Sequence, residues 1–126
     1  MALEVTRREQ EGVSILQLTG SLRFGPEEAR LSDEIRRALA GHDVRMVMDM
    51  GGVDRIDSAG LGTLLFARAE LRRAGGGLAL AKLHPSHRRA LQVAGLDSAF
   101  NISNTQRDAV NKLLLEPASF NLMLMR

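Results

Sequence analysis

Polar and apolar residues alternate at the start of the chain in the pattern of two short strands. In residues 3–8, Leu3 and Val5 alternate with Glu4 and Thr6, and residues 13–19 alternate again after a turn at residues 10–12. The adjacent apolar residues Ile15 and Leu16 leave the register of this second strand open. A period of two puts successive side chains on opposite faces of a strand. The pattern therefore predicts an antiparallel hairpin that forms one edge of a sheet.

The pattern then changes to the spacing of a helix. Residues 20–26 are predicted to be a loop, and Pro26 with the two glutamates that follow it is typical of a helix start. The apolar residues that come next share one face of a helix, at Leu31, Ile35, Ala38 and Leu39. Gly41 is expected to end this helix.

A mostly apolar run at residues 44–50 contains two charged residues, Arg45 and Asp49. Such a run is typical of a central strand that is covered on both faces. Gly51 and Gly52 are predicted to end the strand, and a short irregular passage is expected after them.

Ser58 is the centre of the next segment. Apolar residues recur after it at helical spacing, at Leu61, Leu64, Leu65, Ala67, Leu71 and Ala74. Ser58 is therefore predicted to be the N-cap, whose hydroxyl accepts a hydrogen bond from a backbone N–H of the first turn. A cap alone is one interpretation. The other is that Ala59, Gly60 and Gly62 leave little bulk near the hydroxyl, so that a large partner could reach it, and that the helix end would accommodate a phosphate on Ser58.

The remaining sequence again alternates strand and helix. Three glycines at residues 75–77 precede an apolar strand at residues 78–83, and Pro85 begins a helix that ends at Gly95. Residues 100–102 are predicted to form a brief edge strand. Strands that alternate with helices imply parallel crossover connections.

A last helix is predicted after a cap at Asn104 or Thr105. We therefore predict an α/β fold, a single domain at residues 1–115 with a mixed, mostly parallel sheet of four to five strands and about four helices. An apolar C-terminal tail at residues 116–126 follows it.

Two features leave alternatives open. Arg68 falls within the apolar side of the Ser58 helix and Phe66 falls outside it. Either the phase of the helix drifts, or Arg68 extends its charge to water and Phe66 is exposed to a partner. The tail at residues 116–126 is too apolar for a free solvated end, so it either folds back on the domain or makes a homodimer or partner contact.

Composition narrows the classes of function. The 126 residues, 44% hydrophobic and 25% charged, suit one globular domain. The absence of cysteine excludes disulfides and thiolate chemistry. A net charge of +2, with four Phe as the only aromatic residues, argues against a nucleic-acid partner. The chain shows neither a signal-peptide pattern nor an apolar run near the ~20 residues that span a bilayer, so we expect a cytoplasmic protein without a membrane span.

The sequence predicts no catalytic residues. Ser58 with Asp57 and one of His42, His84 or His87 is an imaginable hydrolase set, but Ser58 lacks the Gly-X-Ser-X-Gly turn that exposes a nucleophile. The histidines are expected to be solvated, and the pair three residues apart has no third metal ligand beside it. We expect no enzyme activity, no metal and no cofactor.

Residues 53–62, Val-Asp-Arg-Ile-Asp-Ser-Ala-Gly-Leu-Gly, follow an apolar strand that ends in Asp49. This run resembles the signature of the STAS domain, and of bacterial anti-sigma-factor antagonists in particular. The resemblance extends over residues 13–115 and includes residues 94–100, Ala-Gly-Leu-Asp-Ser-Ala-Phe. It implies that Ser58 is phosphorylated by an anti-sigma factor with serine kinase activity and that a metal-dependent serine phosphatase removes the phosphate. The unphosphorylated protein would sequester the anti-sigma factor and free its sigma factor, as a binding switch in transcription regulation.

The resemblance implies a partner-binding surface made of Arg23, Asp57, Ser58, Ala59, Gly60, Leu61, Gly62 and Phe66. Two positions depart from the family pattern. Arg23 stands where many antagonists carry an acidic residue, and it would favour a bound phosphate or an acidic partner. Ala59 replaces a second serine. This replacement keeps an alternative open, an accessory STAS subunit of a lipid-transport ABC system that grips its ATPase without phosphorylation.

Overall fold

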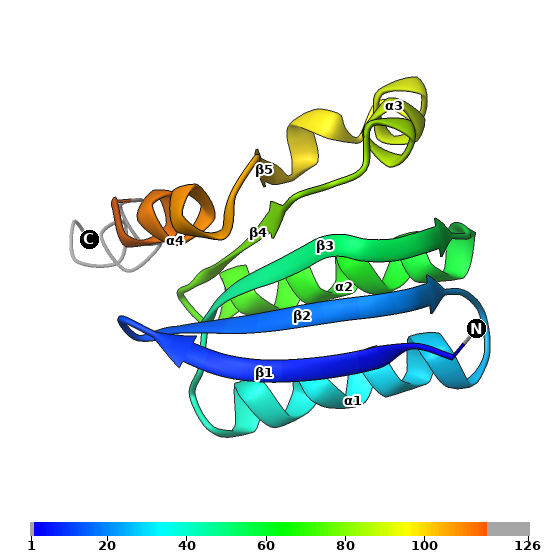
Figure 1. Cartoon of the computed structure of the whole chain (residues 1–126). Helices are drawn as coiled ribbons and strands as arrows, with labels where there is room; N and C mark the ends of the chain where they lie inside the picture. The colour runs from blue at the N-terminus through cyan, green and yellow to red at the C-terminus, as the bar shows by residue number, and fades with distance from the viewer. Residues whose placement is uncertain (1, 116–126) are drawn as a thin grey trace.

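The computed structural model describes residues 2–115, in which helices flank both faces of a five-stranded sheet (Figure 1). The strands lie across the sheet in chain order, from β1 to β5. The predicted α/β class and the alternation of strands and helices are confirmed. Along the chain the elements are β1 (Glu4–Gln10), β2 (Val13–Leu22), α1 (Pro26–Ala40), β3 (Arg45–Ile56), α2 (Ser58–Arg73), β4 (Gly77–Ala81), α3 (Pro85–Val93), the 3₁₀ turn η1 (Asp97–Ala99), β5 (Asn101–Ser103) and α4 (Gln106–Leu115).

The predicted hairpin joins β1 and β2 in antiparallel pairing. Its two loop residues, Glu11 and Gly12, have φ angles of 55° and 80°, as a two-residue hairpin loop with the twist of its strands requires. The other three strand pairs are all parallel. The sheet is therefore mixed, with the antiparallel strand at one edge, as the sequence predicts.

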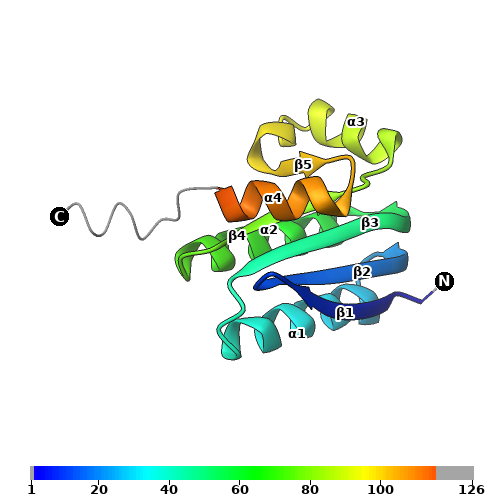
Figure 2. The same cartoon turned by 60° about the vertical axis from the view of Figure 1, so that its left-hand side comes forward.

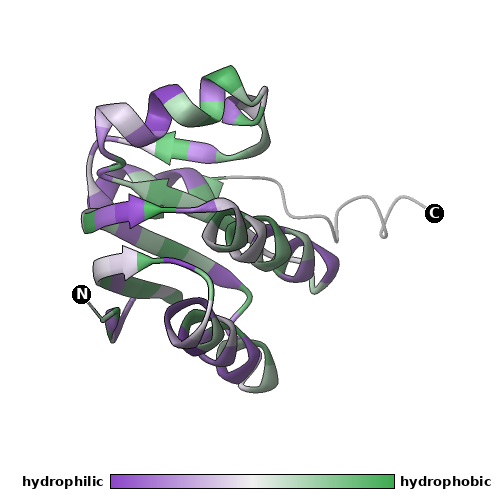
Figure 3. Cartoon of the chain, turned by 90° about the vertical axis from the view of Figure 1, so that its right-hand side faces the viewer, coloured by the Kyte–Doolittle hydropathy of each residue, from purple (hydrophilic) through white to green (hydrophobic). Residues whose placement is uncertain are grey.

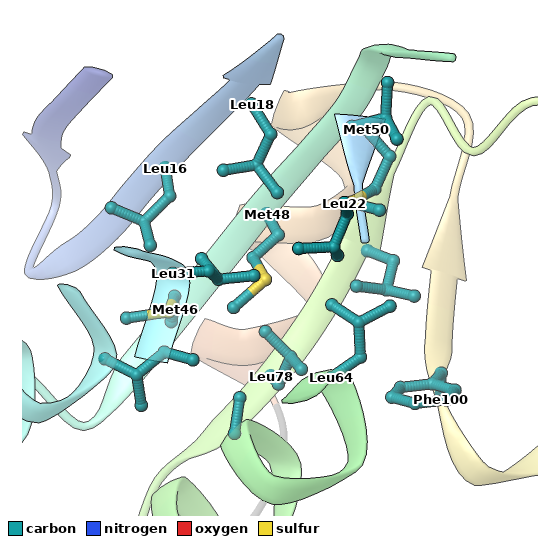
Figure 4. Packing of buried hydrophobic residues seen from close by; sticks show 14 of the residues in the cluster. Leu16, Leu18, Leu22, Leu31, Met46, Met48, Met50, Leu64, Leu78 and Phe100 are labelled. Carbon is teal, nitrogen blue, oxygen red and sulfur yellow. The ribbon is translucent and has the colours of Figure 1, made fainter. Parts of the chain in front are cut away.

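The larger hydrophobic core lies between the sheet and α1, α2 and α3 (Figure 4). Figure 3, which views the molecule from the side toward which β2 and β3 point, shows α1 and α2 next to each other on one face of the sheet. The strands contribute alternate residues to this core, among them Leu16, Leu18, Met46, Met48, Met50, Leu78 and Leu80.

A second, smaller core lies on the opposite face, where α4 covers the sheet (Figure 2). In that view α4 lies in front of the sheet and α2 behind it. Ala109, Val110 and Leu113 pack there against strand residues such as Ile15 and Val47. β4 and the first half of β3 are covered on both faces and are mostly apolar, whereas β2 keeps polar residues, of which Gln17 and Thr19 are exposed.

Asp49 is the buried charge in the middle of β3, with 2% of its surface exposed. Its Oδ2 accepts a hydrogen bond from Nε2 of Gln106 at 2.6 Å and lies 3.6 Å from Nζ of Lys82, and its Oδ1 accepts one from the N–H of Gly51 at 2.9 Å. A buried carboxylate with all of these partners is a structural link between β3 and α4.

The predicted end of the central strand at Gly51 and Gly52 is wrong. β3 continues through both glycines to Ile56, and its pairing with β2 shifts register between Gln17 and Thr19, which is the mark of a β-bulge. A Cβ on Gly52 would lie 2.9 Å from the carbonyl oxygen of Leu18. The glycine is therefore present because β2 passes close by, and not because the chain turns.

The predicted loop at residues 20–26 is also too long, because β2 continues to Leu22. The connection to α1 is only the three residues between Leu22 and Pro26. At the other end of the domain, Thr105 caps α4, since its Oγ1 accepts a hydrogen bond from the N–H of Asp108 at 3.0 Å. This settles the choice between Asn104 and Thr105.

The phase predicted for the Ser58 helix is correct. Leu64, Ala67 and Leu71 are buried, whereas Phe66 has 36% of its surface exposed and Arg68 is half-buried. No helix of the described part of the chain is long and apolar enough to cross a membrane. The predictions for the tail at residues 116–126 lie outside the described residues.

Candidate functional site

The candidate site lies at the C-terminal ends of the neighbouring strands β2 and β3, where α2 begins. The N–H of Asp57 donates a hydrogen bond to the carbonyl oxygen of Leu22 at 3.2 Å, which fixes the first residue after β3 against the last residue of β2. Just before these residues, the buried Ser21 hydroxyl of β2 donates a hydrogen bond to Oδ1 of Asp54 in β3 at 2.8 Å. That bond lowers the pKa of Asp54. The two strand ends are thus held together before the helix starts.

Asp57, and not Ser58, is the N-cap of α2. Its Oδ1 accepts a hydrogen bond from the N–H of Gly60 at 2.8 Å, and its Oδ2 accepts one from the N–H of Phe24 at 2.9 Å. The bonds from Phe24 and Gly60 lower the pKa of Asp57 because they stabilise the ionised carboxylate. The prediction that Ser58 caps the helix is therefore wrong by one residue. The Asp57 side chain accepts hydrogen bonds both from the first turn of α2 and from the loop before α1.

Ser58 is the first residue of α2 and is exposed to solvent. Among residues 2–115 its hydroxyl has no hydrogen-bond partner, because Asp57 already performs the capping. The side chain therefore contributes little to holding the fold. It stands at the positive end of the helix dipole, where an anion is favourable.

The two glycines that follow Ser58 have different reasons to be glycine. A Cβ on Gly60 would lie 2.3 Å from the carbonyl oxygen of Leu22, so Gly60 lets α2 approach β2. A Cβ on Gly62 would meet nothing within 4 Å, and Gly62 is exposed. The sequence suggested that Ala59, Gly60 and Gly62 all leave space around the Ser58 hydroxyl. In the structure only Gly62 and the half-buried Ala59 do so on the outer surface, because Gly60 packs against β2.

Arg23 and Phe24 extend this surface from the loop between β2 and α1. Phe24 has 78% of its surface exposed, although its backbone is bonded to Asp57. Arg23 is also exposed, and its charge helps to lower the pKa of Asp57. Arg23 therefore lies near the start of α2, and its role in partner binding stays a prediction.

Phe66 lies two turns farther along α2 and faces α1. The guanidinium carbon of Arg36 lies 5.7 Å from the centre of the Phe66 ring, within the range of a cation–π contact. The first turns of the two helices are also linked, because Oγ1 of Thr63 donates to Oε2 of Glu28 at 3.0 Å. Phe66 therefore lies on the side of α2 that faces α1, whereas Ser58 lines a cavity toward α3, so Phe66 is not part of the immediate surroundings of Ser58.

A cavity of about 160 Å³ opens beside Ser58, between the start of α2 and α3. Its lining is mostly apolar and consists of Ile56, Asp57, Ser58, Leu61, Leu64, Leu83, His87, Ala90 and Leu91. A volume of ~150 Å³ is enough for a benzene ring. The predicted site residues Asp57, Ser58 and Leu61 thus form one wall of a hollow that fits one apolar side chain.

His87 is half-buried in this cavity, contrary to the expectation that the histidines are solvated. Burial lowers its pKa, and the nearby backbone of Asp54 opposes the shift. His84 has a different role, since its Nδ1 accepts a hydrogen bond from the N–H of Ser86 at 3.2 Å and caps α3.

The arrangement does not form a hydrolase triad. Ser58 and His87 line one cavity, but both carboxylate oxygens of Asp57 accept backbone N–H groups instead of orienting an imidazole. Within the described part of the chain no three His, Cys, Asp or Glu residues are grouped to hold a metal ion. The geometry suits binding and surface modification better than acid–base catalysis.

Phe24 and His87 are the site residues that sequence reasoning missed. An aromatic residue between Arg23 and Gly25, in a loop of three residues, was the available signal for Phe24. For His87 the signal was weaker. It is a histidine in the first turn of α3, a helix in which only Leu91 is buried. Both depend on how α1 and α3 pack beside α2.

The chain matches the family model of the STAS domain over residues 4–109. It is 30% identical over 107 residues to BtrV of Bordetella bronchiseptica, a protein named as an anti-sigma factor antagonist, and the match covers 85% of this chain and 91% of BtrV.

Solved structures share the fold. The chain superposes with a TM-score of 0.79 on the crystal structure of an anti-sigma factor antagonist from Mycobacterium paratuberculosis, at 24% identity, covering 90% of this chain and 95% of that one. It superposes with a TM-score of 0.68 on the Bacillus cell fate determinant SpoIIAA in its phosphorylated form, at 20% identity, covering 88% and 98%. These identities show the fold alone, whereas the family match and the likeness to BtrV show that the chain belongs to the STAS domain family and, within it, to the anti-sigma factor antagonists.

Proposed function

We propose that this protein is an anti-sigma factor antagonist whose binding to its partner is switched by phosphorylation of Ser58. The observation that carries the proposal is the division of roles at the start of α2. Asp57 caps the helix, so the exposed Ser58 hydroxyl is left outside the hydrogen bonding of the fold. A phosphate there would change the surface without removing an interaction that the domain needs.

The electrostatics of the site support a tolerated phosphate. The helix N-terminus stabilises a nearby anion by about 0.3–1 kcal/mol at an exposed position. Arg23 adds a positive charge on the loop bonded to Asp57, and the carboxylate of Asp57 opposes it. A phosphoserine carries roughly −1.5 to −2 charges at neutral pH. The fold would therefore remain intact while the outer surface becomes negatively charged.

The surface around Ser58 supports protein binding. Phe24 in the loop before α1 is a large exposed apolar side chain, Phe66 on α2 is partly exposed, and the cavity beside Ser58 is large enough for one apolar side chain of a partner. Buried aromatic anchors and filled pockets dominate the affinity of protein interfaces. We infer that the partner is an anti-sigma factor with serine kinase activity, in keeping with the relatives named anti-sigma factor antagonists.

The proposed switch works through the partner's chemistry. The Ser58 oxygen would attack the γ-phosphate of ATP bound by the kinase, forming an O–P bond as ADP leaves and a base of the kinase takes the hydroxyl proton. The phosphate charge would then face the surface of the partner, which fits the neutral hydroxyl of unphosphorylated Ser58, and binding would weaken. A coupling free energy of ~3 kcal/mol would weaken binding about 150-fold. A serine phosphatase would remove the phosphate and restore binding. We expect the protein in the cytoplasm, where ATP and sigma factors are found.

The test uses a serine-kinase anti-sigma factor encoded in the same genome. Incubation with that kinase and ATP should add one phosphate to the wild-type protein and none to Ser58→Ala, as read by intact mass. Ser58→Asp should stay folded and bind the kinase at least about tenfold more weakly in calorimetry. Ser86→Asp is the matched control, since Ser86 is also exposed in the first turn of a helix.

Equal affinities of the wild type, Ser58→Asp and Ser86→Asp would count against the switch. Stable pairing with a transporter ATPase, with no phosphate on Ser58, would instead support the accessory subunit of a lipid-transport system.

A further inference from the structure

A second cavity, of about 200 Å³, lies near the opposite end of α2 from Ser58. At 1.5 Å per residue, Arg72 lies roughly 20 Å along the helix from Ser58, so this cavity is separate from the proposed partner surface. Its lining combines α2 with β4, η1 and β5, and consists of Arg68, Arg72, Gly77, Leu78, Ser98, Ala99, Phe100 and Asn101.

Arg68 and Arg72 bring two positive charges to this cavity without a carboxylate partner among residues 2–115. The neighbouring Arg73, by contrast, pairs with Glu70 at 3.1 Å. Residues four apart on a helix are neighbours on its surface, and like charges at this spacing destabilise the helix. The fold therefore keeps a concentrated positive charge at the cavity and offers no anion of its own to balance it.

Neither ordinary role of an arginine accounts for the pair. A cation in the last turn of a helix interacts favourably with the helix dipole, which suits Arg72 and Arg73. Arg68 lies one turn earlier, and it is half-buried on the apolar side of α2. Packing of its aliphatic stem explains the burial. Neither role requires both arginines to line the same cavity.

The rest of the lining suits an anion. The floor contains Leu78 and Phe100, which are 4% and 6% exposed and reduce contact with water on one side. Ser98 adds a hydroxyl that can donate a hydrogen bond. Arg68 is half-buried and Arg72 is exposed, so partial desolvation strengthens the attraction to an anion mainly at Arg68.

We propose that this cavity binds a small soluble anion that carries a phosphoryl group. Two guanidinium forks match the paired oxygens of a phosphoryl group and make charge-assisted hydrogen bonds to it. Two arginine charges also balance the roughly −1.5 to −2 charges of a phosphate monoester at neutral pH. The hollow shape fits a free anion better than the flat surface of a membrane.

The experiment is a titration with inorganic phosphate at constant ionic strength, with chloride as the replaced anion, followed by amide NMR. The amide signals of Ser98 and Asn101 should shift and saturate, while the signal of Ser58 stays in place. Arg68→Gln and Arg72→Gln should each weaken phosphate binding at least about tenfold. Arg73→Gln, in the same helix turn but outside the cavity lining, should keep the affinity within about twofold.

Arg68→Lys provides a second variant for the half-buried position, because it keeps the charge and removes the fork. It should bind phosphate more weakly than the wild type while it melts at nearly the same temperature. The proposal is overturned if the wild type shows no saturable shifts up to about 20 mM phosphate, or if all three glutamine variants weaken binding equally. Binding to vesicles of anionic phospholipid without binding of free phosphate would also overturn it.

Discussion

Gly60 and Gly62 lie in the same turn of α2, and replacing each by alanine should change stability in opposite directions. Alanine in place of a helical glycine gains about 0.5–1 kcal/mol, because it reduces the entropy of the unfolded chain. A Cβ on Gly62 meets no heavy atom within 4 Å, so Gly62→Ala should keep this whole gain.

At Gly60 the same methyl group would lie 2.3 Å from the carbonyl oxygen of Leu22 and 2.9 Å from its Cγ. The backbone of β2 cannot move aside, so α2 must shift. Overpacking of a core typically costs about 1–3 kcal/mol. A contact of 2.3 Å with a backbone atom belongs in the upper half of that range, about 2–3 kcal/mol. Subtracting a helix gain of about 1 kcal/mol leaves Gly60→Ala destabilised by roughly 1–2 kcal/mol.

The measurement is urea unfolding followed by circular dichroism, with thermal melting as a second readout. With an unfolding entropy of ~2.1 cal/mol/K per residue, 1 kcal/mol corresponds to about 4 °C in the melting temperature of a chain of 126 residues. Gly62→Ala should therefore melt about 2–4 °C higher and Gly60→Ala about 4–8 °C lower than the wild type. Shifts in the same direction, or a neutral Gly60→Ala, would refute the close approach of α2 to β2. If partners dock over Gly62, the more stable variant should also bind them more weakly.

The remaining predictions concern three side chains. Asp49→Ala should cost about 1–3 kcal/mol of unfolding free energy, as measured by urea unfolding, because it removes the acceptor that Gln106 and Gly51 share and the link between β3 and α4. The folded-state pKa of His87 lies below 6.5. The unfolded chain therefore binds more protons as the pH falls through 6.5, and stability declines over that window. His87→Gln should remove this part of the decline in urea midpoints measured between about pH 7.5 and pH 5, while His42→Asn should retain it. Phe24→Ala should leave stability within ~0.5 kcal/mol and weaken partner binding at least about tenfold in calorimetry, whereas Val93→Ala, at an equally exposed position, should leave binding unchanged.

The order of strands and helices could be predicted from the sequence because it depends on hydrophobic periodicity. The central strands contain mostly apolar runs at residues 44–50 and 77–81, and α1 carries its buried residues at helical spacing. The end of β3 could not be predicted in this way. Two adjacent glycines indicate a turn when only local propensity is considered. In the structure the neighbouring strand passes so close to Gly52 that a side chain does not fit, and tertiary packing overrides the local signal.

The cap of α2 shows the same limit at a single residue. Aspartate and serine are equally good N-cap residues, so the sequence Asp57-Ser58 is compatible with either one. The choice is made by the loop between β2 and α1. The Phe24 N–H bonds to the Asp57 carboxylate, and Leu22 accepts from the Asp57 N–H, so Asp57 is held from three sides. No local pattern records these contacts, since the residues are more than thirty positions apart.

This placement of the cap bears directly on the proposed switch. A phosphate on Ser58 would stand beside the carboxylate of Asp57, and two negative groups so close repel each other. Asp57 cannot turn away from the phosphate without losing its bonds to Phe24 and Gly60, which anchor the loop and the helix. The repulsion therefore favours conformations in which the phosphate points outward, toward solvent or a bound partner. A rigid, fully bonded aspartate next to a free serine thus directs the added charge to the surface where it can alter binding.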